Sequence, residues 1–292
     1  MLQSLLDDLI SVEGVEIVVM RDFRLPILCQ IVTVRTPRNP VEFDVLFDAC
    51  LATSDAVWPI APESGGTLES VSRRILNSGK RLLGSSPEAI HVASSKIATS
   101  RILACAGIPA VPTYHSVAGL DDYRGPVVVK PDDGAGCRQT YYFEESGVAA
   151  EWLEANPESA YVVQPYLPGE ALSLSLVCQS GRARVLSCNR QQVVVRESMF
   201  HFEGTEAGAG GDGAAYQPLA NAIARVLPGL WGYVGVDFIA TRDGPAVMEI
   251  NPRLTTSYVG LAEVGGVNPA RLVLGLVDPV RFGKPEVGYA YA

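Results

Sequence analysis

The sequence predicts a mixed α and β protein of two to three domains, with an N-terminal α/β part followed by a β-rich α+β part. The segment before Pro87 alternates short apolar runs with helical patterns, which is typical of βαβ units. From Val127 onward, short strand-like runs separated by polar turns dominate instead. Of the 292 residues, 48% are hydrophobic and 19% are charged, which is enough apolar material for a folded core and too little charge for a disordered chain.

The N-terminal part is expected to open on a helix. Leu2–Ile10 has apolar residues at helical spacing, and the first strand is expected only at Val15–Met20. A βαβ domain normally opens on a strand, and we expect this domain to lack that strand. Either residues upstream are missing from this chain, or another element or subunit fills the edge of the sheet. The next expected elements are strands over 43–50 and 55–60, the first ending in a helix or loop, a helix over 64–77 and one long helix over 87–106.

The second part is expected to be a series of strands with a few helices packed on them. Val, Ile, Tyr and Phe are frequent in its apolar runs, and Gly, Pro, Asp and Asn bound them. The expected strands cover 127–130, 140–143, 161–164, 171–178, 184–189, 191–195, 232–239 and 246–250. The expected helices cover 151–155 and 220–227, and the segment 269–275 is expected to end in a helix. A glycine-rich loop is expected over 204–213.

Charge and composition exclude several classes of function. The formal net charge of −9 argues against nucleic-acid partners, which require a basic surface. No apolar run approaches the roughly 18 residues of a membrane span, and the first eight residues carry acids where a signal peptide carries bases. The six cysteines form no C-x-x-C pair, as expected of free thiols. The sequence therefore predicts a cytoplasmic protein with small-molecule substrates and neither nucleic-acid nor membrane partners, and it leaves a homodimer open.

Lys130 ends an apolar strand and is followed at once by a flexible turn that contains Gly134, Ala135 and Gly136. Glycines let backbone N–H groups approach an anion closely. The turn is not a Walker loop, because no Gly-Lys-Ser/Thr follows, and it is not a G-x-G-x-x-G motif. From the residues alone it is either a β-hairpin turn or an anion-binding loop.

Asp237, Glu249 and Asn251 are expected to meet on one face of a hairpin. Glu249 and Asn251 are two residues apart on one strand, so their side chains point the same way. An Asp-Gly turn at 243–244 makes a hairpin that brings Asp237 opposite them. Two carboxylates and an amide oxygen form a hard-oxygen site suited to Mg²⁺, and a solvated hairpin face is the alternative.

The segment 162–170 runs from a strand into an extended linker. Pro165 has a carbonyl acceptor but no N–H donor, and Leu167 keeps its N–H. An extended backbone that offers an acceptor and then a donor is able to pair with the edge of adenine. An ordinary interdomain linker is the alternative interpretation.

Taken in order, these segments resemble the ATP-grasp superfamily of carboxylate–amine ligases. The resemblance is carried by a lysine-bearing helix, the Val-Val-Lys-Pro-x-x-Gly-x-Gly stretch from Val128, Gln-Pro-Tyr-Leu-Pro-Gly-Glu at 164–170 and Glu-Ile-Asn-Pro-Arg at 249–253. It covers residues 87–270. Residues 251–258 are most similar to the branch that contains the tyramine–glutamate ligases of methanofuran or methylofuran biosynthesis.

This resemblance implies an ATP-grasp fold with an N-terminal α/β domain over 1–95, a small lid domain over 96–164 and a C-terminal α+β domain over 165–292. The implied cofactors are ATP and Mg²⁺, with Mn²⁺ as an alternative ion. For ATP, the resemblance implies that the phosphates are neutralised by Lys96 and Lys130 and covered by a loop with Gly134, Ala135 and Gly136. It implies that adenine is bound by Gln164, Pro165, Tyr166 and Leu167, and the ribose by Glu170. It implies that the metal is bound by Asp237, Glu249 and Asn251, that the transferred phosphoryl group is stabilised by Arg253, and that the substrate is bound by Arg190. A surface position is the alternative for Lys96, and a surface salt bridge is the alternative for Arg190. Some relatives carry an arginine where this chain has Gly235, so charge stabilisation is expected to rest on Arg253.

The implied reaction is phosphoryl transfer from ATP to a substrate carboxylate, followed by attack of an amine on the acyl phosphate to give an amide, ADP and phosphate. The leading substrate that the resemblance implies is an amino-acid carboxylate, glutamate, joined to a small amine. Two alternatives stay open: a small-molecule kinase that keeps the phosphate on its substrate, and a nucleotide-binding sensor without turnover.

Overall fold

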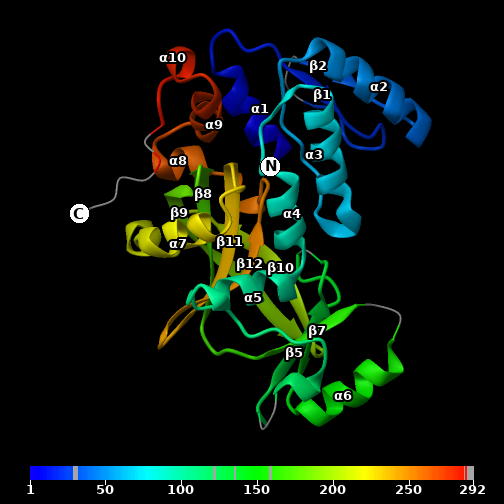
Figure 1. Ribbon diagram of the computed structural model, residues 1–292, viewed down its shortest axis with the longest axis vertical. Coiled ribbons are helices and arrows are strands. Elements are labelled where there is room, and N and C mark those ends of the chain that lie inside the picture. Colours follow the sequence, from blue (N-terminus) through cyan, green and yellow to red (C-terminus); the bar gives the residue numbers. More distant parts are fainter. Residues whose placement is uncertain (29–31, 121–122, 135, 158–159, 286, 288–292) are drawn as a thin grey trace.

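The structure is a computed structural model that describes residues 1–28, 32–120, 123–134, 136–157, 160–285 and 287. Ala135, one of the expected loop residues, lies outside the described residues. The N-terminal helices gather at one end of the molecule, a long sheet occupies the middle, and a small unit with α6 forms the other end (Figure 1).

The N-terminal part alternates helices with short parallel strand pairs. Its elements are α1 (Leu2–Ile10), β1 (Val18–Met20), β2 (Thr33–Arg35), α2 (Pro40–Thr53), β3 (Ala56–Val57), the 3-10 turn η1 (Ser64–Gly66), α3 (Thr67–Asn77) and β4 (Arg81–Leu82). β1 pairs with β2 and β3 pairs with β4, both in parallel, and α3 connects β3 to β4 as in a βαβ unit. The expected opening helix is confirmed, and residues 2–10 form no strand. Leu5 and Val12 of this region pack into a cluster with Tyr233 and Val273 of the C-terminal part.

The strand expected over 43–50 is wrong, because this segment lies inside α2. Asn39 caps the helix by accepting the Glu42 N–H at 2.9 Å, and Pro40 takes the first helical position. Phe47 and Leu51 are buried four residues apart, a helical spacing. The strand expected over 55–60 shortens to β3, since Pro59 cannot donate to a ladder.

The long helix expected over 87–106 is two helices, α4 (Pro87–Ser94) and α5 (Lys96–Cys105). Ser95 between them has extended backbone angles and caps α5, because its Oγ accepts the Ala98 N–H at 3.1 Å. The same Oγ donates to Asp132 Oδ2 at 2.7 Å. The break therefore puts Lys96 at the first turn of α5, beside the glycine turn.

The central sheet has eight strands in the order β12-β11-β8-β9-β10-β6-β5-β7, all paired antiparallel. They are β5 (Val127–Pro131), β6 (Tyr141–Phe143), β7 (Tyr161–Pro165), β8 (Glu170–Gln179), β9 (Arg182–Arg196), β10 (Met199–Glu206), β11 (Gly232–Thr241) and β12 (Gly244–Asn251). The two strands expected over 184–195 are one continuous strand, β9, which places Arg190 within it. The loop expected from Gly204 starts later, because β10 continues to Glu206.

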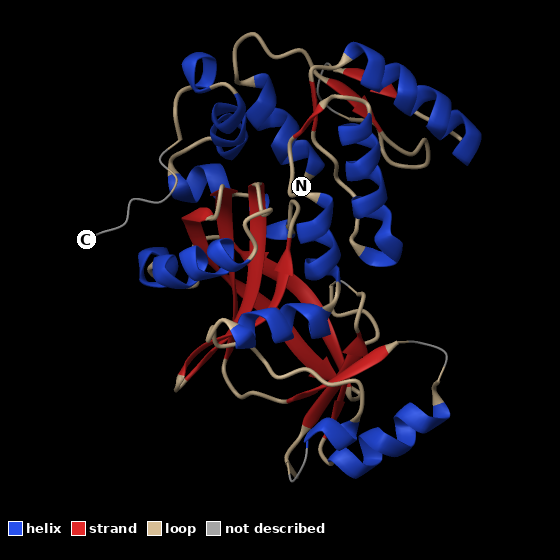
Figure 2. Ribbon diagram, in the orientation of Figure 1, coloured by secondary structure: helices blue, strands red, loops and turns tan. Residues whose placement is uncertain are grey.

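Helices cover the sheet on its outside (Figure 2). α4, α5 and α7 (Gln217–Val226) share one core with β8, β11 and β12, including Leu103, Leu174 and Ile223. α6 (Ser146–Ala155) covers β5, β6 and β7, with Trp152 and Val129 in a second core. The remaining elements are η2 (Val117–Leu120), η3 (Gly213–Tyr216), η4 (Thr256–Tyr258), α8 (Leu261–Gly265), α9 (Pro269–Val277) and α10 (Pro279–Phe282). In the part of the chain that the structure describes, no helix is long and apolar enough to cross a bilayer.

Candidate active site

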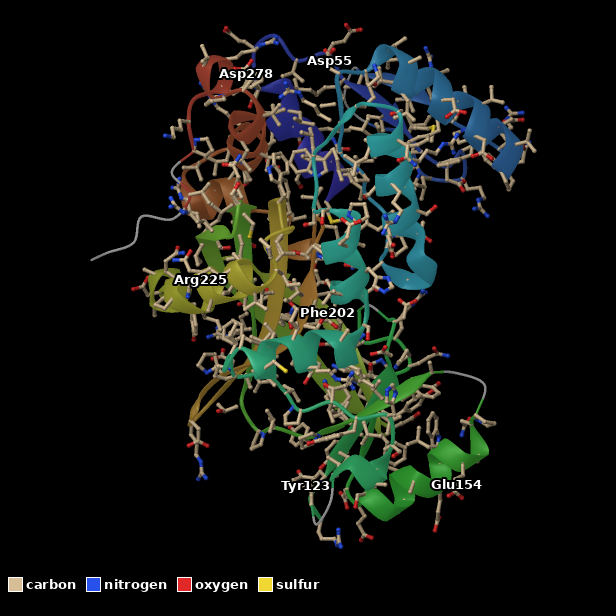
Figure 3. All side chains as sticks on the ribbon, in the orientation of Figure 1. Asp55, Tyr123, Glu154, Phe202, Arg225 and Asp278 are labelled. Carbon is tan, nitrogen blue, oxygen red and sulfur yellow. The ribbon has the colours of Figure 1, made fainter. Side chains whose placement is uncertain are left out.

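A cavity of about 600 Å³ lies within the curve of the sheet and is lined by β5 and β7 through β12. Phe202, labelled in the middle of Figure 3, belongs to its wall. The volume is in the range of small-molecule sites. The expected site residues that line it are Lys96, Lys130, Gly134, Gly136, Gln164, Pro165, Tyr166, Leu167, Asp237, Glu249, Asn251 and Arg253. Segments more than 100 residues apart in the sequence thus converge on one space.

Two buried lysines approach the cavity from different elements. Lys96 is 5% exposed, and its Nζ donates to the carbonyls of Asp132 at 3.1 Å and Gly134 at 2.8 Å. Lys130, at the end of β5, is 6% exposed. Desolvation lowers the pKa of Lys130 to about 8, against the opposing pull of Glu249. Two buried ammonium groups in one wall favour an anion, so a surface position for Lys96 is excluded.

The expected hairpin brings the three oxygen ligands together. β11 and β12 pair with Asp237 opposite Glu249 and Gly235 opposite Asn251, with a bulge after Asp237. Asn251 Nδ2 donates to Asp237 Oδ2 at 3.1 Å, and Lys96 Nζ lies 3.8 Å from Glu249 Oε2. The trio is therefore not a solvated hairpin face but part of the cavity wall.

The two carboxyl groups of this trio have opposite pKa shifts. Desolvation and the neighbouring Glu249 raise the pKa of Asp237 well above its ordinary value. Desolvation also acts to raise the pKa of Glu249, but Lys96 and Lys130 outweigh it, and the net shift is downward. A buried carboxyl pair with an amide oxygen beside it fits a hard divalent cation, which relieves the repulsion between the carboxylates. The described ranges contain no group of three or more His, Cys, Asp or Glu side chains that could hold a metal ion, so a cation here would depend on the Asn251 amide oxygen as well as on the two carboxyl groups.

The β7–β8 linker passes along the cavity. The Tyr166 N–H donates to the Pro126 carbonyl at 2.8 Å, which fixes the linker to the start of β5. The Tyr166 ring meets the Tyr142 ring edge to face at 5.2 Å. Gln164 is buried, and its amide donates to Thr113 Oγ1 at 2.8 Å. The linker thus presents its backbone to the cavity from a fixed position.

Glu170 and Arg190 are not part of the cavity wall. Arg190 Nε donates to Glu170 Oε1 at 2.5 Å, and each side chain is 48% exposed. The surface ion pair weighed for Arg190 is therefore present, with Glu170 as its partner. Their expected roles in ribose and substrate binding require both side chains to leave this pair.

Arg253 follows β12 and is held by two protein acceptors. Its Nε donates to Glu63 Oε2 at 2.7 Å and its Nη1 donates to the Leu254 carbonyl at 3.0 Å. Glu63 is one residue that sequence reasoning missed. Its signal was the Pro-Glu-Ser-Gly-Gly stretch at 62–66, a sharp turn directly before a helix.

A buried cluster of hydroxyl groups at one end of the cavity was also missed. The Tyr233 hydroxyl lies 3.0 Å from Ser175 Oγ, 3.0 Å from Thr255 Oγ1 and 3.3 Å from Ser257 Oγ. Gln191, another lining residue that sequence reasoning missed, donates to Asp237 Oδ1 at 2.8 Å. Because these partners are 22 to 58 residues apart, no local sequence pattern predicts the contacts.

A curved antiparallel sheet that encloses a site with paired lysines and an acidic hairpin defines the ATP-grasp fold. Residues 93–257 match the family model described as the ATP-grasp domain, and residues 15–90 match the pre ATP-grasp 3 domain. The chain therefore belongs to the ATP-grasp family, whose enzymes use ATP and a divalent metal.

Named relatives lie within this family. The chain is 29% identical over 209 residues to the tyramine–L-glutamate ligase of Methanocaldococcus jannaschii. The matched segment covers 71% of this chain and 58% of that protein. The chain thus spans little more than half the length of that relative. An ATP-grasp superfamily protein of Archaeoglobus fulgidus has a similar fold, with a TM-score of 0.65, 24% identity and coverage of 88% and 73% of the two chains. The L-amino acid ligase of Bacillus licheniformis has a TM-score of 0.70 at 19% identity, with coverage of 89% and 67%.

Proposed function

We propose that this chain is an ATP-dependent ligase that joins an amino-acid carboxylate, glutamate in the first instance, to a small amine. The reaction passes through an acyl phosphate and releases ADP and phosphate. The observation that carries the proposal is the convergence of two buried lysines, a buried carboxyl pair and Arg253 on one cavity. The proposal agrees with family membership and with the named activity of the Methanocaldococcus relative.

Each group has a distinct part in this proposal. Lys96 and Lys130 neutralise the phosphates of ATP, and the backbone around Gly134 and Gly136 covers them. Asp237, Glu249 and Asn251 are the residues that would hold Mg²⁺, which supplies positive charge to the phosphates when it is bound.

Arg253 acts where the substrate carboxylate accepts the phosphoryl group. Its guanidinium stabilises the charge of the phosphoryl group as it moves to the carboxylate. The hydroxyls of Thr255 and Ser257, two and four residues further on, line the same cavity and are placed to hydrogen-bond a small polar substrate. The protein therefore acts by positioning and charge neutralisation, without a protein nucleophile.

The substrate assignment rests on the glutamate-using relative and on the cavity. Besides these hydroxyls, the cavity wall contains the apolar side chains of Val193, Val195, Phe200 and Phe202. Polar and apolar surfaces in one cavity suit a polar amino acid together with an amine that carries an apolar or aromatic group. A polymeric acceptor does not suit a chain with a net charge of −9.

The test supplies ATP, Mg²⁺ and glutamate with hydroxylamine in place of the amine, and measures hydroxamate and ADP together. We expect equal amounts of ADP and glutamyl hydroxamate, because hydroxylamine traps the acyl phosphate. Hydroxamate from another amino acid but not from glutamate keeps the ligase and overturns the substrate. ADP with a stable phosphorylated product indicates a kinase, and no ADP with any carboxylate indicates a sensor.

A further inference from the structure

A buried ion pair joins the N-terminal part to a residue of the cavity wall. Glu63 and Arg253 are 190 residues apart, and Arg253 Nε donates to Glu63 Oε2 at 2.7 Å. Both side chains are largely buried, 9% exposed for Glu63 and 15% for Arg253. A buried, charge-assisted hydrogen bond of this length holds its partners in one geometry.

The contact determines which way the guanidinium faces. A guanidinium has five N–H groups in a rigid plane. Glu63 takes the Nε–H and the Leu254 carbonyl takes one Nη1–H. Within the described part of the chain, the other three N–H groups have no protein acceptor, and Arg253 lines the cavity. The ion pair therefore leaves a fork of donors for a ligand in the cavity.

A second contact holds the segment that carries Glu63. The segment 63–66 turns through Gly65 and Gly66, both in the left-handed region, and the Gly65 N–H donates to Asp133 Oδ2 at 2.7 Å. This contact ties the Glu63 segment to the glycine turn. A glycine is needed at Gly65 and at Gly66, because positive φ angles strain other residues.

The Glu63–Arg253 ion pair is a poor source of folding stability. Glu63 Oε1 is buried and has no hydrogen-bond partner among the described residues. Burying a carboxylate with one oxygen unpaired costs free energy. A group that is kept in spite of this cost is a candidate for a functional role.

We propose that Glu63 is a positioning residue that orients Arg253 toward the transferred phosphoryl group. The N-terminal part then belongs to the catalytic unit, although none of its described residues lines the cavity. The proposal rests on the proposed function in one respect, the assignment of Arg253 to the transferred phosphate.

The test compares Glu63→Ala, Glu63→Gln, Arg253→Ala and the double variant Glu63→Ala/Arg253→Ala. Glu69→Ala is the matched control, because Glu69 pairs with Arg73 at 2.9 Å in the same part of the chain but does not line the cavity. The measurements are thermal stability, the affinity for Mg²⁺ with ADP, the affinity for Mg²⁺ with a non-hydrolysable ATP analogue, and the rate of ADP release.

We expect Glu63→Ala to weaken binding of the ATP analogue about tenfold while leaving ADP binding nearly unchanged, since only the analogue has a γ-phosphate. The rate should fall about 10²-fold, as for a misplaced catalytic group. Glu63→Gln keeps an acceptor for the Nε–H and should be intermediate, and Glu69→Ala should match the wild type. The double variant should be no worse than Arg253→Ala, because both changes remove the same interaction.

Two results would overturn the proposal. One is additivity of the two substitutions. The other is equal weakening of ADP and analogue binding in Glu63→Ala, which a general loss of structure would produce. A wild-type protein that releases no ADP with any substrate overturns the proposed function instead, and the two nucleotide affinities still decide the role of Glu63.

Discussion

Replacing Lys130 by methionine should stabilise the nucleotide-free protein and abolish nucleotide binding. Desolvation lowers the pKa of this fully buried lysine from 10.5 to about 8. At about 1.4 kcal/mol per pH unit, that fall corresponds to a cost of about 3 kcal/mol for keeping the ammonium charged at pH 7. Methionine has a similar length and no charge, so Lys130→Met should recover up to this amount.

The expected rise in melting temperature is at most about 6–12 °C, because ~1 kcal/mol corresponds to roughly 2–4 °C for a chain of this size. The assay is thermal unfolding with and without Mg²⁺ and ATP. The exposed Lys284→Met variant is the control, and its melting temperature should equal that of the wild type. Nucleotide should raise the melting temperature of the wild type and of Lys284→Met but not that of Lys130→Met.

The pH dependence follows from the direction of the shift. The folded chain disfavours the charged lysine, so the cost is present in full below about pH 8 and disappears as pH rises towards 10.5. Wild-type stability should therefore approach that of Lys130→Met across this window. A lower melting temperature for Lys130→Met at pH 7, or a retained nucleotide response, would refute the reasoning.

Three further predictions concern the same cavity. Glu249→Ala and Asn251→Ala should each remove Mg²⁺-dependent turnover without unfolding the chain, and near-normal rates at ordinary Mg²⁺ would disprove the metal assignment. Hydrogen exchange should slow at residues 132–134 and 136–138 when Mg²⁺ and ATP bind, and unchanged exchange there counts against loop closure. Burial raises the pKa of Cys137 to about 11, so iodoacetamide at pH 7.5 should modify the exposed Cys105 first; equal rates contradict this.

The parts of the fold that local chemistry determines were predictable from the sequence. The β11–β12 hairpin followed from alternating apolar residues around an Asp-Gly turn, and the structure confirms the expected register of Asp237 and Glu249. The apolar run within α2 has the pattern of a short strand, and only Asn39 and Pro40 before it are start signals of a helix. The break at Ser95 was missed because the contact that stabilises it, with Asp132, lies 37 residues away.

The candidate site also contains a part that the sequence predicts and a part that depends on tertiary packing. Lys130 and the glycine turn are contiguous in the sequence, so their proximity was foreseeable. The Glu63–Arg253 pair and the partners of Tyr233 depend on how separate elements pack, which periodicity does not encode. The Arg190–Glu170 pair likewise forms across the register of β8 and β9.

The most direct test of the central claim follows oxygen from the substrate carboxylate. Glutamate labelled with ¹⁸O in its carboxylates is supplied with ATP, Mg²⁺ and an amine, and the released phosphate is analysed by mass spectrometry. An acyl phosphate intermediate predicts one ¹⁸O atom in each phosphate, because the carboxylate oxygen leaves with the phosphoryl group when the amine attacks. Amide and ADP formed with unlabelled phosphate would contradict the account.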